Sequence, residues 1–108
     1  MKLAASIHVL AGAFADQRLA YAHLLDAADR AGLSPDFDHV EVVTPPHGPR
    51  LRGFFDDAAT ARLAEAAGAD ALILVLPGAL VTGAFEADAR LHDLGRWDGW
   101  ITRAPIPE

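Results

Sequence analysis

The spacing of hydrophobic and polar positions predicts strands that alternate with helices along the chain. Residues 3–11 alternate between apolar and polar as a half-buried strand does, and residues 40–43 form a short β-branched run. Residues 71–76 are apolar throughout, which is typical of a central strand covered on both faces. We expect a last strand within residues 90–100, at the edge of the sheet.

Two helices are expected between these strands. Apolar positions at helical spacing place them at about residues 17–31 and 58–67. The residues expected to cap and stop them are Asp16 and Gly32 for the first, and Asp56 or Asp57 and Gly68 for the second. The buried stripe expected on the first helix consists of Leu24, Ala27, Ala28 and Ala31, flanked by Ala20 and Leu25.

The order β-α-β-α-β, followed by an edge strand, predicts a small layered α/β domain over residues 1–104, with an extended tail at residues 105–108. Because helices between strands usually form crossovers, we expect the first three strands to be partly parallel. A ferredoxin-like α+β sandwich is the alternative, since residues 40–43 can pair as a hairpin with residues 50–55. The prolines between these two segments predict a stiff, exposed turn.

Composition narrows the class of protein and the compartment. The 108 residues carry nine basic and fifteen acidic side chains, a formal net charge of −6, and no cysteine. This balance disfavours nucleic acids and anionic membranes and suits a basic protein partner. The excess of alanine and arginine indicates a GC-rich bacterial genome. Because His8 interrupts the short apolar start, we interpret that start as a strand rather than a secretory signal, and expect a cytoplasmic protein.

No motif for catalysis, a cofactor or a metal is evident in the sequence. The turn after Gly12 lacks the glycine pattern that cradles a pyrophosphate, no two histidines have metal-ligand spacing, and no serine lies in a nucleophile elbow. We therefore expect no cofactor, no metal and no catalytic residue. Two acid–base arrangements stay open: Asp70 or Asp93 meeting a histidine in a cleft, and Ser6 beside His8 on one strand face.

The negative charge is concentrated in residues 16–41, which hold six carboxylates and two arginines. Two of the carboxylates lie three positions apart on one face of the expected helix. The first hypothesis is therefore a non-enzymatic acidic protein-binding domain. Its expected partner-binding residues are Asp26, Asp29, Asp36, Asp38 and Glu41.

Two other hypotheses remain. Open α/β sheets bind small ligands or substrates at the carboxyl ends of their strands. The residues expected to line such a pocket are Gly12, Phe14, Thr44, His47 and Pro77, with the basic Arg50 and Arg52 able to hold an anion. An oligomeric accessory protein would instead use Trp97 and Trp100, two large aromatic side chains near the expected edge strand, as interface anchors.

Three segments of the chain carry a likeness to a known family. They are residues 7–16, with a glycine-x-phenylalanine turn and Tyr21 one helical turn further on, the apolar residues 70–75, and the Leu-Gly-aromatic segment 91–97. Together they resemble the immunity protein 22 family of bacterial polymorphic-toxin systems, whereas residues 32–69 do not. The resemblance implies a small cytosolic protein that binds and blocks a toxin without catalysis, and it assigns no binding residues.

Overall fold

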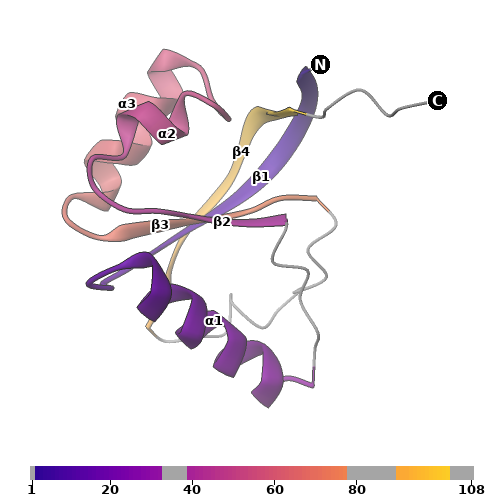
Figure 1. Ribbon diagram of the computed structural model, residues 1–108. Helices are drawn as coiled ribbons and strands as arrows, with labels where there is room; N and C mark the ends of the chain where they lie inside the picture. Colours follow the sequence, from indigo (N-terminus) through magenta and orange to yellow (C-terminus); the bar gives the residue numbers. More distant parts are fainter. Residues whose placement is uncertain (1, 33–38, 78–89, 103–108) are drawn as a thin grey trace.

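The computed structural model describes residues 2–32, 39–77 and 90–102, and Figure 1 shows their arrangement. Within these ranges the chain forms four strands and three helices. The elements are β1 (Lys2–Gly12), α1 (Gln17–Arg30), β2 (Val40–Val43), α2 (Gly48–Leu51), α3 (Asp57–Ala67), β3 (Ala71–Val75) and β4 (His92–Thr102). The strands make one sheet in the order β2-β3-β1-β4.

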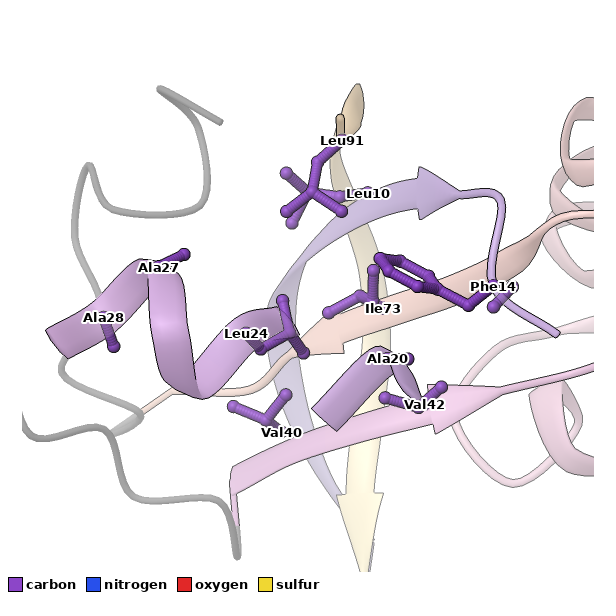
Figure 2. Close-up of a cluster of buried hydrophobic side chains, with 11 residues drawn as sticks. Leu10, Phe14, Ala20, Leu24, Ala27, Ala28, Val40, Val42, Ile73 and Leu91 are labelled. Carbon is purple, nitrogen blue, oxygen red and sulfur yellow. The ribbon is translucent and has the colours of Figure 1, made fainter. Parts of the chain in front are cut away.

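Helices cover both faces of this sheet, so the molecule has three layers (Figure 1). Successive residues of β3 point to opposite faces. Ile73 packs into the hydrophobic cluster under α1 (Figure 2), while Leu72 and Leu74 pack into the cluster under α2 and α3. The predicted small layered α/β domain is therefore confirmed, and so is the buried central strand, although β3 ends at Val75 and is fully buried only over residues 71–74.

The expectation of partly parallel strands is wrong. Every neighbouring pair in the sheet is antiparallel, with Gly12 of β1 opposite Ala71 of β3 and Val43 of β2 opposite Leu72. The crossover through α1 does leave β1 and β2 pointing the same way, but β3 lies between them and runs in the opposite direction. The α2–α3 segment leaves and rejoins the sheet at the same end, so it acts as a long hairpin connection.

The ferredoxin-like alternative has the right sheet, since antiparallel strands in the order β2-β3-β1-β4 have the topology of a split β-α-β unit, but the hairpin expected for it is not formed. Its hairpin needs an extended segment at residues 50–55, but α2 occupies the start of that segment and β2 pairs with β3 instead. Pro49 lies in the first turn of α2, where proline is tolerated because that N–H has no partner inside the helix. The proline-rich turn is not exposed throughout, since His47 within it is buried.

The helix ends follow the sequence closely. Asp16 and Asp56 each accept a hydrogen bond from a backbone N–H of the following first turn, at 2.9 and 2.8 Å, and so cap α1 and α3. Gly32 and Gly68 adopt φ angles of 73° and 58° just after the helices, in the left-handed region that glycine favours. The predicted caps and stops are confirmed, and Asp56 rather than Asp57 caps α3.

The two edges of the sheet are protected to different degrees. On β2 the carbonyls of Val40 and Val42 accept hydrogen bonds from the Tyr21 hydroxyl (3.1 Å) and from Nε2 of Gln17 (2.8 Å), both on α1. On the other edge lies β4, which pairs with β1 along its length and is the predicted edge strand, ending two residues later than expected. There the Trp100 N–H donates to the carbonyl of Phe54 (2.8 Å).

Candidate functional site

The outer face of α1 combines exposed leucines with carboxylates. Leu19 and Leu25 are 48% and 47% exposed and are the exposed large hydrophobic side chains of the described residues. Leu25 was expected to flank the buried stripe, but its position on the helix turns it to solvent. Asp26 and Asp29 lie on the same outer face, because residues three, four and seven positions apart share one side of a helix.

The charges of this face are mixed, because α1 carries the exposed Arg18 and Arg30 as well as Asp26 and Asp29. Asp26 forms an ion pair with Arg30 one turn later (3.0 Å), and both side chains are about two-thirds exposed. Such an exposed pair contributes little to stability and exchanges readily with water or another partner. Asp29 makes no ion pair with any residue in the part of the chain that the structure describes.

The other expected partner-binding residues are not placed with these two. Glu41 lies on β2 with its side chain turned to the opposite face of the sheet, where it accepts a hydrogen bond from Nε of Arg50 on α2 (2.7 Å). Asp36 and Asp38 lie outside the described residues. Among the described residues, the carboxylates on α1 are therefore Asp26 and Asp29.

The residues expected to line a ligand pocket are divided between the two faces of the sheet. Phe14 is buried under α1, with the guanidinium of Arg90 4.7 Å from its ring centroid and the ring of His23 at 5.4 Å. Its ring also packs so closely on Gly12 that a Cβ there would lie 2.5 Å from a ring carbon. These two residues therefore form part of the core under α1.

The remaining pocket residues lie elsewhere. His47 is buried, with Nε2 2.7 Å from the carbonyl oxygen of Asp70, while Thr44 is half-buried at the end of β2. Arg52 is exposed near Asp57, and Arg50 pairs with the Glu41 carboxylate on the α2 side. Pro77 follows β3, whose antiparallel direction takes it to the end of the sheet opposite Gly12. A ligand pocket among these residues stays a prediction.

The buried His8 on β1 contacts the half-exposed carboxylate of Asp93 on β4. Nε2 of His8 lies 2.8 Å from Oδ1 of Asp93, and the same oxygen accepts the Gly95 N–H at 2.7 Å. The Gly95 N–H and then His8 hold the pKa of Asp93 below its usual range. The carboxylate is thus ionised at neutral pH, so it accepts a hydrogen bond from the N–H at Nε2 of His8. This hydrogen bond orients the imidazole.

This pair is the histidine–carboxylate meeting that the sequence left open for Asp93. A carboxylate that orients an imidazole is one part of a general-base arrangement. Ser6 lies two residues along the same strand face, but its hydroxyl forms no hydrogen bond with His8 in the structure. Asp70 meets His47 only through its backbone carbonyl. Within the described ranges no group of three histidine, aspartate or glutamate residues is placed to hold a metal ion.

The two tryptophans do not form one patch. Trp97 is opposite Ile7 in the β1–β4 ladder and packs on the cluster under α2 and α3, with its Nε1 donating to the carbonyl of Leu94 (2.9 Å). Trp100 is three residues further along β4, opposite Ala4, and so belongs to the other face of the strand. An oligomeric interface that uses both side chains stays a prediction, and it would have to take them from opposite faces of β4.

Comparison with family models, curated proteins and solved structures finds no match for this chain. The likeness to the immunity protein 22 family therefore stays a prediction. No helix among the described residues combines the length and the apolar character needed to cross a membrane.

Proposed function

We propose that this protein works by binding another protein, and that the outer face of α1 is the contact surface. The observation that supports this proposal is the grouping of Leu19 and Leu25, both about half exposed, with Asp26 and Asp29 on one helix face. Exposed apolar side chains rimmed by charges are typical of interaction sites. On the molecule's other described surfaces, large apolar side chains are buried or half-buried.

The chemistry of this face favours a basic partner. The whole chain carries a formal charge of −6, so its field attracts a positively charged protein over distance. On contact, Asp29 forms an ion pair with a lysine or arginine of the partner. Asp26 exchanges its exposed ion pair with Arg30 for an ion pair with a second basic residue of the partner. The two leucines then bury apolar area beside these charges.

The resemblance to the immunity protein 22 family gives this proposal a specific form. A toxin that acts on nucleic acid or another anionic substrate needs a basic surface, and a helix face that presents carboxylates on an acidic chain can cover it. In this form the protein neutralises its partner by occlusion, and no reactive group of its own takes part. A rigid contact surface suits such occlusion, and α1 is held on the sheet by its buried stripe and by the hydrogen bonds of Gln17 and Tyr21 to β2.

The proposal is tested by capture from native cells with matched charge variants. The bait variants are the wild type, the double reversal Asp26→Lys with Asp29→Lys, and the control Asp57→Lys with Glu65→Lys. The control makes the same charge change on α3, which covers the opposite face of the sheet. Circular dichroism first establishes that all three are folded. Captured proteins are then quantified by mass spectrometry.

We expect a basic protein to be recovered with the wild type and with the α3 control. With the α1 variant its recovery should fall at least about tenfold, because the charge pairs that Asp26 and Asp29 form with the partner are lost. The affinity of the purified partner should fall in the same order. Equal recovery by the wild type and the α1 variant would overturn the proposal.

A further inference from the structure

The middle of β4 is an open sheet edge. β4 is the outermost strand on its side of the sheet. Beyond the register shift near Gly95, its even-numbered residues direct their backbone groups away from β1, as the Trp100 N–H does in reaching Phe54. Arg96 and Asp98 have the same parity as Trp100, with no register shift between them. Among the described residues, nothing bonds to their outward N–H and C=O groups.

This open stretch is short and bounded. At one end Phe54 takes the Trp100 N–H and approaches Gly99 so closely that a Cβ there would lie 2.2 Å from the Phe54 carbonyl oxygen. At the other end Gly95 has a φ of 87°, and the Asp93 side chain takes its N–H. The free edge therefore runs over residues 95–99. The opposite edge of the sheet offers no equivalent, since α1 occupies the outward carbonyls of β2.

Residues 95–99 read Gly-Arg-Trp-Asp-Gly, which is complementary to itself when two copies run antiparallel. With a two-fold axis at Trp97, Arg96 of one copy lies directly opposite Asp98 of the other. By symmetry, Asp98 of the first copy lies opposite Arg96 of the second. Both side chains are exposed, and neither forms an ion pair within the described chain. The two glycines face each other at the ends, and the two Trp97 residues meet at the axis.

The backbone allows only a few registers, and charge selects among them. Outward-facing residues must pair with outward-facing residues, so the axis falls on a residue rather than between two. An axis at Arg96 sets arginine against arginine, and an axis at Asp98 sets aspartate against aspartate; like charges directly opposite each other are destabilising. The axis at Trp97 makes both pairs favourable. It also makes Trp97 a pair without backbone hydrogen bonds, in which side chains approach most closely.

We infer that the protein forms a two-fold symmetric homodimer by antiparallel pairing of β4 with β4 of a second copy, in the register centred on Trp97. Backbone hydrogen bonds at Arg96 and Asp98 join the two sheets into one, and the Arg96–Asp98 pairs fix the register. The inference does not rest on the proposed function, because α1 takes no part in this edge.

Charge exchange at positions 96 and 98 tests the inference. Arg96→Asp makes both positions acidic, Asp98→Arg makes both basic, and the double variant swaps the charges. The molecular mass of each is measured by analytical ultracentrifugation over a wide concentration range, and circular dichroism confirms folding. We expect the wild type to dimerise, each single variant to dimerise at least about tenfold more weakly, and the double variant to recover the wild-type affinity. An equimolar mixture of the two single variants should form a heterodimer.

Each result bears on the inference directly. Recovery in the double variant and in the mixture supports it, because no role of either residue within one chain explains both. A wild type that stays monomeric at the highest concentration overturns it. A folded double variant that dimerises no better than the single variants also overturns it. If one single variant fails to fold, the wild type and the double variant still decide between these outcomes.

Discussion

Asp93 shows how one carboxylate can be placed by donors from two parts of the chain. Its Oδ1 accepts the Gly95 N–H from its own strand and faces His8 of β1, 85 positions away in the sequence. The sequence identified Asp93 as a carboxylate that can meet a histidine, but which histidine it meets depends on the β1–β4 register. That register is set by the whole length of both strands, which no local pattern reveals.

The lowered pKa of Asp93 gives a prediction about acid stability. A carboxyl group whose pKa is lower in the folded than in the unfolded state stabilises the fold fully above its ordinary value of 3.8. The contribution is lost as pH falls through the lowered, folded-state pKa. We therefore expect the unfolding free energy of the wild type to fall more steeply between about pH 5 and pH 2 than that of Asp93→Asn.

Urea unfolding at a series of pH values measures this difference. The asparagine keeps an oxygen that accepts the Gly95 N–H, so the variant should fold, and its amide does not titrate. Because the Asp93 side chain is about half exposed, solvent screening keeps the effect modest. Parallel pH profiles for the two proteins would contradict the prediction.

At the scale of elements, α1 does more than cover one face of the sheet. Its side chains Gln17 and Tyr21 reach over the edge and take the two outward carbonyls of β2, leaving β4 as the open side. Burial of the Tyr21 ring raises the pKa of its hydroxyl, which keeps it protonated and able to donate. Edge strands left unprotected are templates for pairing, so this arrangement directs association to one side of the molecule.

Removing the Tyr21 hydroxyl tests this edge protection. We expect Tyr21→Phe to lower the unfolding free energy by about 1 kcal/mol, because the carbonyl of Val40 loses a donor while the ring keeps its packing. Tyr21→Leu should cost more, since it also loses ring contacts with the cluster under α1. Chemical unfolding of the three proteins gives both values. A phenylalanine variant as stable as the wild type would show that the hydroxyl contributes nothing to β2.

The elements were predictable where their signals are local. Asp16 and Asp56 are side-chain caps, and the β-branched run at residues 40–43 forms β2 with the expected bounds. The helix α2 was missed because its four residues include Pro49 and follow a proline-rich turn, which locally indicates a break. Leu25 was misplaced because a helix in an alanine-rich chain has an ill-defined edge to its apolar stripe.

At the scale of the whole molecule, strand direction was the property that local patterns did not reveal. A helix between two strands predicts a parallel crossover, and α1 obeys that rule for β1 and β2. The α2–α3 segment does not, because it returns to the end of the sheet from which it left. The antiparallel sheet also separates the expected pocket residues, since Pro77 and Gly12 come to lie at opposite ends. The candidate site thus depended on topology, which is a non-local property.

The layered arrangement predicts where the fold is most resistant to opening. β3 is hydrogen-bonded on both sides and buried on both faces, so exposing the amides of Ile73 and Leu74 requires breaking the sheet and both clusters. Hydrogen exchange followed by NMR should find them at least about 100-fold slower than the Asp98 amide of dilute protein, and limited by global unfolding. Because the Asp98 amide points away from β1, its exchange should slow as the concentration rises and β4 finds its second copy. Exchange of β3 through a low-energy local opening would mean that the two helical layers do not hold the sheet as one cooperative unit.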